Sequence, residues 1–366
     1  MEIGIVGLPN VGKSALFKAL TGINVDVEKY QFTTTKPAHG TAAVPDGRLH
    51  LIGEYIETRK YVPATIDLVD LPAIVSGASS GEGLGNKFLE HLRQVDAIAH
   101  VVRCFDNDQV MHINDALDPV SDAEAVETEL LLADLQVLES ARDKAVRRTR
   151  TGDAQAKHRV EVCEKGIAAL ENEKALRAVD WHEDEAAEFR ALGMISMRPV
   201  LYVANVSEDD ITGESERVGK LRRWVSEKEG AERGQVVPIS AELEAEFAEL
   251  EESERSEMLE GMGLKEPAIA VLARALYELL GLQSFYTAGI KEIRAWTIRR
   301  NQTAPIAAGV IHSDIQRGFI RCETYSVDDL VEYKSEKAIR ESGKMRSEGK
   351  QYIMQDGDVC HFLFNA

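Results

Sequence analysis

Short apolar segments recur along the first two-thirds of the chain and predict the strands of a buried sheet. They occupy residues 3–6, 66–69, 97–102, 200–204 and 236–239. Strands that are apolar on both faces are typical of parallel sheets covered by helices. We therefore expect an α/β fold in which crossover helices connect mainly parallel strands.

A long region of helical periodicity interrupts this series of strands after about residue 120. Its apolar positions are three, four or seven residues apart, as in the seam between packed helices. These positions are Leu131, Leu135, Leu138, Ala145, Val160, Cys163, Ile167 and Leu170. A polar turn at residues 149–153 separates two such helices. The pattern predicts an antiparallel helical hairpin, or coiled coil, inserted at residues 123–198 of a sheet domain formed by residues 1–122 and 199–281.

The last part of the chain has a different character. Residues 242–260 contain nine Glu and one Arg, which we interpret as a solvated helix face, and residues 267–280 predict an amphipathic helix that closes the sheet domain. Residues 283–366 contain short strand-like pieces and carry a net charge of +1, against -20 for the residues before them. We expect a separate module at residues 282–366.

Composition narrows the class of protein. The chain has 366 residues and a net charge of -19, so a general coat for nucleic acid is disfavoured and no DNA partner is expected. No stretch approaches the roughly 20 apolar residues of a membrane helix, and no signal peptide is expected. The four cysteines are too few and too scattered for a disulfide scaffold or a zinc site. A cytoplasmic protein without a membrane partner is predicted.

A phosphate-binding loop follows the first predicted strand. Residues 7–14 (GLPNVGKS) match G-x-x-x-x-G-K-[ST] and precede a predicted helix, which is the context that this motif requires. Gly7 and Gly12 allow the backbone to wrap phosphates with its N–H groups pointing inward. Lys13 can reach the β- and γ-phosphates, and Ser14 can bind Mg²⁺. A glycine turn with an incidental lysine is the alternative.

Further Mg²⁺ ligands are expected after the second apolar run. Asp70 ends this run, where a carboxylate faces the phosphate loop in this class of fold, whereas Asp67 lies inside the strand and is less well placed. Thr34, in the run Thr33-Thr34-Thr35, supplies a hydroxyl for Mg²⁺ and the γ-phosphate. The Gly-rich residues 77–85 predict a second loop that orders on the γ-phosphate, as in nucleotide-dependent switches; passive loops are the alternative.

Four segments together resemble the YchF/Obg-like ATPase family. They are residues 7–14, Asp70 with residues 77–88 (GASSGEGLGNKF), residues 103–105 (RCF) and residues 205–208 (NVSE). The resemblance covers essentially the whole chain, including the helical insertion and a C-terminal module similar to the family's TGS domain, a small β-grasp fold. It implies a P-loop nucleotide hydrolase of the TRAFAC class with an OBG-type G domain.

The resemblance also bears on the choice of base. Related GTPases carry Asn-Lys-x-Asp, whose Asp accepts two hydrogen bonds from guanine, whereas this chain has Val206 and Glu208 in place of the Lys and the Asp. Losing a charge-assisted hydrogen bond costs roughly 1.5–3 kcal/mol, enough to erase a preference for guanine. The family implies that ATP is favoured over GTP. We assign nucleotide contacts to Asn10, Val11, Gly12, Lys13, Ser14, Ala15, Asn205, Val206, Glu208, Ser240 and Ala241.

The residues that promote hydrolysis differ from those of Ras-like enzymes. Ile74 stands near the usual glutamine and cannot orient water. Pro72 and Ala73 replace Ala and Gly of the family pattern, which stiffens the turn and favours slow turnover. The resemblance implicates a histidine after Arg-Cys-Phe, which by spacing is His112. A lone histidine is more often a surface or core residue.

The same resemblance indicates ions and partners. Asn10 corresponds to an asparagine that helps related hydrolases to bind K⁺, and Thr33 replaces a cysteine linked to redox control in some members. The family implies an ATPase switch on the ribosome or ribosomal RNA. Basic residues around Trp296 suit RNA contacts, although a solvated strand face is equally expected; they are Lys291, Arg294, Arg299, Arg300, Arg317 and Arg321. A true GTPase, or a nucleotide-stabilised binding protein with negligible turnover, remains open.

Overall fold

The structure, a computed structural model, describes the chain except residues 23–36, 74–83, 108–116, 150–151, 232 and 366. The described residues form two compact units. The first contains residues 1–41 and 67–272, and the second contains residues 42–66 and 273–366. None of the described helices is long and apolar enough to cross a membrane.

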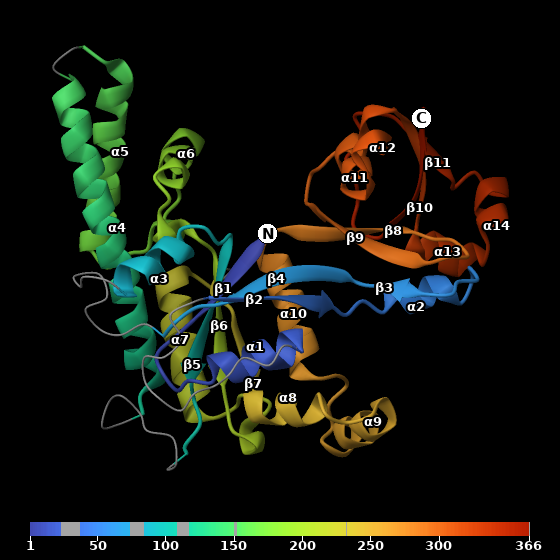
Figure 1. Ribbon diagram of the computed structural model, residues 1–366, viewed down its shortest axis with the longest axis horizontal. Coiled ribbons are helices and arrows are strands. Elements are labelled where there is room, and N and C mark those ends of the chain that lie inside the picture. The colour runs from blue at the N-terminus through green and yellow to red at the C-terminus, as the bar shows by residue number, and fades with distance from the viewer. Residues whose placement is uncertain (23–36, 74–83, 108–116, 150–151, 232, 366) are drawn as a thin grey trace. The chain divides into compact units, whose positions relative to one another are not determined.

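Six strands of the described chain form a sheet with the order β2-β4-β1-β5-β6-β7 (Figure 1). Their bounds are Glu2–Val6 (β1), Ala38–Val44 (β2), Ala64–Asp70 (β4), Ala97–Arg103 (β5), Val200–Asn205 (β6) and Val236–Ile239 (β7). β1 pairs in parallel with β4 and β5, β5 with β6, and β6 with β7. The five predicted strands and their parallel arrangement are confirmed. β2 was not predicted, because its sequence AHGTAAV contains mostly small or polar residues.

Apart from the helical insertion, three described helices of the first unit lie between these strands in the chain, and three more follow β7. They are α1 (Lys13–Thr21), α3 (Leu84–Leu92), α7 (Glu216–Glu229), α8 (Ala241–Phe247), α9 (Glu252–Gly261) and α10 (Ala268–Leu279). α10 confirms the predicted helix at 267–280. In the acidic segment, Leu243, Phe247 and Leu259 form a small apolar cluster, so the Glu residues surround a buried contact. Because the parallel strands share one direction, the segments that follow Val6, Asp70, Arg103 and Asn205 leave the sheet at the same edge.

Two long helices lie side by side in the first unit (Figure 1). They are α4 (Pro119–Thr149) and α5 (Ala154–Glu171), and the Asp153 side chain caps α5 by accepting a hydrogen bond from Ala156 N at 3.1 Å. Apolar residues of both helices share one cluster, to which α6 (Glu183–Ala191) adds Phe189. Leu138, Cys163 and Ile167 are among its buried members, as the spacing predicted.

A buried group of charged residues joins this helical pair to the sheet. Arg177, in the short 3-10 helix η1 (Leu176–Ala178), donates to Glu127 of α4 at 2.7 Å and, through Nε, to Glu229 of α7 at 2.9 Å. Tyr202 of β6 also donates to Glu229, at 3.3 Å. Burial raises the pKa of Glu127, and Arg177 opposes this by stabilising the carboxylate. The group therefore depends on Arg177 to remain ionised.

The second unit contains a mixed sheet. Its order among the described residues is β11-β10-β12-β8-β9-β3, with an internal parallel pair β12–β8 and antiparallel pairs β8–β9, β10–β12 and β10–β11. The bounds are Tyr61–Val62 (β3), Leu282–Thr287 (β8), Ile293–Arg299 (β9), Phe319–Ser326 (β10), Arg346–Glu348 (β11) and Asp358–Phe364 (β12). The helices are α2 (Arg48–Gly53), α11 (Ala304–Ile311), α12 (Ser313–Arg317), α13 (Val327–Tyr333) and α14 (Glu336–Glu341). The TGS-like identity of this module stays a prediction.

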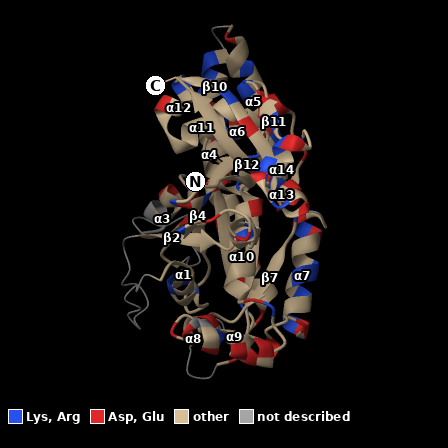
Figure 2. Ribbon diagram, turned by 90° about the vertical axis from the view of Figure 1, so that its right-hand side faces the viewer, with Lys and Arg blue, Asp and Glu red and all other residues tan. Residues whose placement is uncertain are grey.

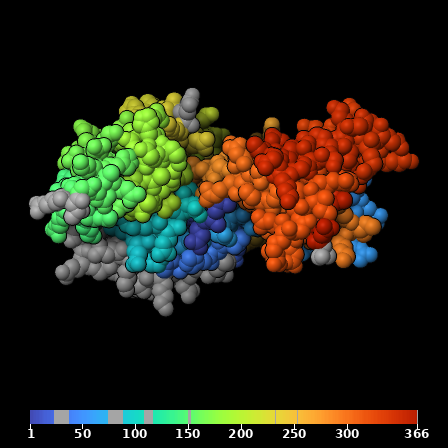
Figure 3. All heavy atoms as spheres, turned by 90° about the horizontal axis from the view of Figure 1, so that it is seen from above, coloured from blue at the N-terminus to red at the C-terminus, as the bar shows by residue number. Residues whose placement is uncertain are grey.

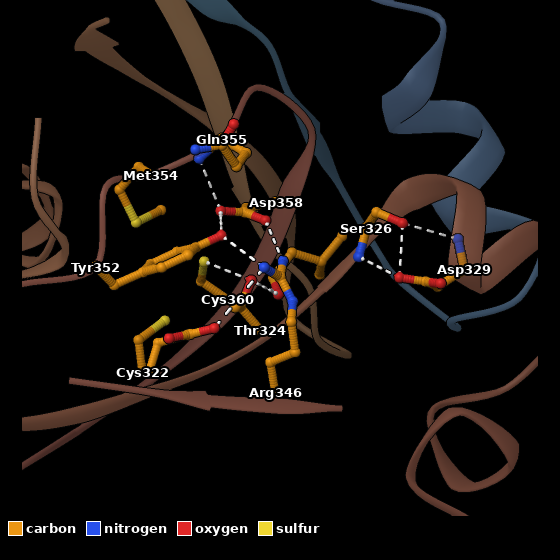
Figure 4. A network of polar contacts seen from close by, with 12 residues as sticks. Cys322, Thr324, Ser326, Asp329, Arg346, Tyr352, Met354, Gln355, Asp358 and Cys360 are labelled. Atoms are coloured by element: carbon orange, nitrogen blue, oxygen red, sulfur yellow. Dashed lines mark hydrogen bonds and ion pairs between the residues drawn. The ribbon is translucent and has the colours of Figure 1, made fainter. Parts of the chain in front are cut away.

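Asp358 organises one end of the second unit (Figure 4). Its buried carboxylate accepts hydrogen bonds from Tyr352 Oη at 2.8 Å and from Gln355 N at 2.9 Å, and it pairs with Arg346 at 3.0 Å. These contacts hold β11, and the loop between β11 and β12, against β12. A carboxylate in this position is tolerated because each of its oxygens is satisfied.

Residues 42–66 group with the second unit, although the sequence analysis placed them in the sheet domain. β3 pairs in parallel with β9, and Arg48 of α2 pairs with Asp356 at 2.7 Å. Asp46 accepts hydrogen bonds from Arg48 and from Tyr286 of β8. The grouping depends on contacts between residues more than 200 positions apart, for which the local sequence pattern gives no signal.

Candidate functional site

The loop between β1 and α1 has the backbone conformation of a phosphate cradle. Gly7, Asn10 and Gly12 have positive φ angles of 154°, 62° and 97°. An added Cβ would be in close contact with the Val101 carbonyl oxygen at Gly7, and with the Asn205 amide at Gly12. Both glycines are therefore required by conformation and by space. Gly12 also caps α1, so the free N–H groups of that helix point towards the loop.

Lys13 lies buried behind this loop. Its Nζ donates hydrogen bonds to the carbonyl oxygens of Gly7 at 3.1 Å and Leu8 at 2.9 Å. Burial lowers the pKa of Lys13 to about 8, and the charge of Asp70 opposes this effect. The ammonium group therefore occupies a site that becomes more favourable when negative charge enters the loop.

Ser14 and Asp70 meet beside the loop. Ser14 Oγ donates a hydrogen bond to Asp70 Oδ2 at 2.9 Å. Asp70 Oδ1 is buried and has no hydrogen-bond partner among the described residues. Burial raises the pKa of the Asp70 carboxyl, an effect that Ser14 and Lys13 oppose. A hydroxyl, a carboxylate and an unsatisfied buried oxygen form a donor set that fits Mg²⁺.

Asp67, the rival carboxylate, lies in a different environment. Its side chain is half exposed, accepts a hydrogen bond from Thr41 of β2 at 3.3 Å and lies 3.6 Å from the N-terminal amine. Side chains alternate between the two faces along a strand, so Asp67 and Asp70, three residues apart, point to opposite faces of the sheet. Of the two carboxylates, Asp70 contacts Ser14.

Asn205 connects three loops at the edge of the sheet. It is buried at the end of β6, its Nδ2 donates to the Val11 carbonyl oxygen at 2.8 Å, and its Oδ1 accepts from Ala241 N at 3.0 Å. Its own carbonyl oxygen accepts a hydrogen bond from Cys104 N at 2.7 Å. The amide therefore fixes the phosphate loop relative to the start of α8. The sequence predicts a nucleotide contact for Asn205 but not this positioning role, for which an amide at a strand end is the available signal.

The residues around Asn205 differ in exposure. Val206 is buried and its N donates to the Ile239 carbonyl oxygen at 2.9 Å, so its side chain belongs to the core. Ser240 is the N-cap of α8, where its Oγ accepts from Leu243 N at 3.3 Å. Glu208 begins the 3-10 helix Glu208–Asp210 and is exposed. Glu208 is the member of the NVSE tetrad whose carboxylate is free to contact a base.

Arg103 and Cys104 support this edge from β5. Arg103 donates to the carbonyl oxygens of Phe105 and Asn107, both at 3.1 Å, and its guanidinium lies 4.7 Å from the centre of the Phe105 ring. Burial raises the pKa of the Cys104 thiol to about 12, so this cysteine is not a nucleophile. The Arg103 contacts fix the backbone of residues 105–107, which follow β5.

Comparisons with known proteins agree with this arrangement. Residues 2–134 match a family described as "50S ribosome-binding GTPase", and residues 282–365 match one described as "Protein of unknown function (DUF933)", YchF-GTPase_C. A protein from Escherichia coli O157:H7 named "Ribosome-binding ATPase YchF" is 46% identical over 365 residues, covering 100% of this chain and 99% of the relative. A Bacillus subtilis protein of the same name is 43% identical, with complete coverage of both. The chain belongs to the YchF family.

The solved structure of a YchF protein agrees with this assignment. The structure of the "Schizosaccharomyces pombe YchF GTPase" has a TM-score of 0.87 at 33% identity and covers 99% of this chain and 97% of that one. The predicted family and the predicted α/β P-loop fold are confirmed. The two bacterial relatives are named ATPases, whereas the Schizosaccharomyces pombe protein is named a GTPase.

Several positions on which the predictions about hydrolysis and metal binding rest lie outside the described residues. They are His112, Thr33, Thr34, Thr35, Ile74 and most of the Gly-rich loop at 77–85. Asn10 and Ala15 lie in the described loop and at the start of α1. His100, a histidine described in β5, is buried, and burial lowers its pKa to about 3. Its ring packs against Tyr202, so it belongs to the core.

Three of the six basic residues expected to contact RNA in the C-terminal module pair with acidic neighbours. Arg294 pairs with Glu292 at 3.0 Å, Arg317 pairs with Asp314, and Arg321 pairs with Glu323 at 3.2 Å. Trp296 is half-buried and stacks on Phe285. Intramolecular ion pairs and core packing therefore account for much of a pattern that the sequence associated with RNA.

Proposed function

We propose that this YchF protein is an Mg²⁺-dependent ATPase that acts as a switch on the ribosome. The observation that supports it most directly is the meeting of Lys13, Ser14 and Asp70 at the phosphate loop. Lys13 is a buried cation beside the carbonyl oxygens of the loop, and Asp70 has an unsatisfied oxygen. Lys13 would stabilise the β- and γ-phosphates, while the backbone N–H groups of residues 10–15 would bind their oxygens.

Ser14, Asp70 and Thr34 are the proposed protein ligands of Mg²⁺. The ion would neutralise charge that develops on the phosphate oxygens. Ser14 and Asp70 already contact each other, which orients both oxygens towards one position. Asn10 is the proposed contact for K⁺, since it lies at a strained position of the loop.

The base site is proposed at Asn205, Val206, Glu208, Ser240 and Ala241. The Asn205 side chain is occupied by Val11 and Ala241, and Val206 is buried, so Glu208 remains to read the base. Guanine-binding loops use a shorter Asp beside a Lys. Without that pair, the roughly 1.5–3 kcal/mol of a charge-assisted bond is lost and ATP is preferred.

His112 is the proposed group that orients the attacking water. An imidazole is neutral at about pH 7 and can accept a hydrogen bond from water. Its assignment rests on the spacing from Arg103-Cys104-Phe105. Turnover should fall far more than ATP affinity in His112→Ala, because the group would act on the γ-phosphate step. His158→Ala, on α5, is the matched control.

Relatives named "ribosome-binding" and a family described in the same terms support the ribosome as partner. A cytoplasmic location follows from that partner. Ribosomal stimulation of phosphate release at saturating ATP would support the complete proposal.

The deciding experiment measures ATP and GTP affinities together with phosphate release, with and without ribosomes. Lys13→Ala and Ser14→Ala should lose nucleotide affinity and turnover; near-native values in both would refute the phosphate site. GTP binding ten-fold tighter than ATP would instead identify a GTPase. Tight ATP binding without turnover, even with ribosomes, would identify a nucleotide-stabilised binding protein.

A further inference from the structure

Positive charge is concentrated at the end of the helical pair that lies farthest from the sheet. Residues 142–159, here called the hairpin tip, contain seven Lys or Arg and two Asp, a net charge of +5 in a chain of net charge -19. Lys and Arg positions gather along this end of α4 and α5 in Figure 2, and atoms of the two helices face the viewer in Figure 3. The hairpin tip is therefore a local basic surface on an acidic protein.

Three cations of the hairpin tip have no ion-pair partner among the residues that the structure describes. Lys144 and Arg147 on α4 and Lys157 on α5 are exposed and form no ion pair within the described part of the chain. They all lie within about two helical turns of the helix ends. In the cluster around Trp296, Arg294, Arg317 and Arg321 are paired with acidic neighbours.

The remaining cations of the tip are paired. Arg142 pairs with Asp143 at 3.2 Å, Arg148 pairs with Asp153 at 2.8 Å, and Arg159 pairs with Glu188 of α6. The free charge is therefore concentrated on Lys144, Arg147 and Lys157. Arg150 adds one charge in the sequence and lies outside the described residues.

Helix electrostatics explain part of this cluster. Arg147 is in the last turn of α4, where a cation is stabilised by the helix dipole. Lys157 is near the first turn of α5, where a cation is disfavoured, and that turn contains no acidic residue. Bringing like charges together at the tip costs further free energy. The helix dipole therefore favours Arg147 at its position and does not favour Lys157.

We propose that Lys144, Arg147 and Lys157 bind the phosphate backbone of ribosomal RNA. The inference rests on the proposed association with ribosomes and names the surface that makes the contact. RNA is favoured over an acidic protein because free, exposed cations on a narrow helical end suit phosphates, which need charge and little shape complementarity. Such contacts carry no base specificity and weaken as salt rises.

The experiment measures binding of the full-length protein to purified ribosomes by co-sedimentation over a salt series. The test variant combines Lys144→Gln, Arg147→Gln and Lys157→Gln. The matched control combines Lys174→Gln, Arg223→Gln and Lys265→Gln, which removes the same charge from exposed positions elsewhere in the first unit. Circular dichroism and ATP affinity, unchanged in both variants, establish that the fold and the phosphate site are intact.

The tip variant should bind ribosomes about ten-fold or more weakly than the control, and the slope of log affinity against log salt should decrease by about two. Protein-free ribosomal RNA should show the same loss. Native binding by the tip variant would overturn the inference and leave the proposed function intact. Loss on ribosomes without loss on naked RNA would assign the tip to an acidic protein and overturn the RNA proposal. Absence of ribosome binding by the unaltered protein would refute the proposed association and the inference with it.

Discussion

At the scale of single residues, Lys13 is held as a buried cation by carbonyl oxygens. Its ammonium contacts Gly7 and Leu8, and burial lowers its pKa to about 8. Phosphate oxygens in the loop would stabilise the charged form and raise that pKa again. The protonation state of Lys13 is thus coupled to nucleotide binding.

ATP binding should therefore take up a proton at pH 8.5. Free protein is partly deprotonated at Lys13 above a pKa of about 8, whereas the complex is protonated, so affinity should fall as pH rises through 8 with a slope of at most one. The γ-phosphate is already ionised in this range. Titration calorimetry in buffers of different ionisation enthalpy measures the proton. Lys13→Gln should show no such uptake; equal uptake in this variant would contradict the assignment.

Substitution of Gly12 tests whether the phosphate loop has room for a side chain at this position. Gly12→Ala places a Cβ at a φ of 97° and against the Asn205 amide. Gly22, at the end of α1, has a φ of 70°, but no atom of the described residues lies within 4 Å of an added Cβ. Both substitutions should cost about 1–2 kcal/mol of stability from backbone strain. Only Gly12→Ala should also reduce ATP affinity, by about ten-fold or more, because it displaces Asn205; equal affinities in a binding titration would show that the loop adapts.

At the scale of elements, the base of the helical pair depends on a buried cation. Arg177 connects Glu127 of α4 to Glu229 of α7, and Tyr202 of β6 joins the same group. β6 ends at Asn205, so the same strand contacts the buried charged group through Tyr202 and supplies Asn205 to the proposed base site. Two carboxylates at this depth require their common partner.

Arg177→Met should destabilise the first unit by about 3–5 kcal/mol, because it leaves two buried carboxylates without a cation. Combining it with Glu127→Leu and Glu229→Leu should recover most of that loss. Urea unfolding followed by tryptophan fluorescence is suitable, because two of the three tryptophans, Trp181 and Trp224, lie in the first unit. Arg190→Met, at an exposed ion pair, should change stability by about 0.5 kcal/mol or less. A similar small effect for Arg177→Met would mean that water or rearrangement compensates.

At the scale of the whole molecule, the second unit is assembled from two distant segments. Residues 42–66 supply β3, α2 and the pair of Asp46 and Arg48 to a unit otherwise formed by residues 273–366. Leu49 and Ile52 of α2 are buried there. The C-terminal segment is therefore incomplete as a folding unit.

A fragment of residues 273–366 should consequently be less stable alone than with a peptide of residues 42–66. The peptide should raise the Tm of the fragment in a concentration-dependent way, since it binds the folded form. A peptide with Asp46→Ala and Arg48→Ala is the control and should give a smaller shift. Thermal unfolding measures both. A fragment whose Tm responds to neither peptide would show that residues 42–66 contribute nothing to its stability.

The sequence by itself determined the parallel sheet, the phosphate loop and the helical pair. Apolar runs of four to six residues, the spacing of Leu131, Leu138 and Ile167, and the motif at 7–14 are local patterns, and the backbone of a strand, helix or loop follows from them. The sequence did not predict β2, because its alanine, glycine and threonine residues give no alternation of apolar and polar positions. Its pairing with β4 makes this segment a strand.

Only the tertiary structure decided which partners these residues have. It separated Asp70, which meets Ser14, from Asp67, and it placed Asn205 between Val11 and Ala241. It also paired Arg294, Arg317 and Arg321 with acidic neighbours. It left Lys144, Arg147 and Lys157 of the hairpin tip without an ion pair to any described residue. The physical reason is that a charge or an amide has the same local sequence signature whether it is satisfied or not. Its partners come from elsewhere in the chain, and burial and pairing arise only when the chain has folded.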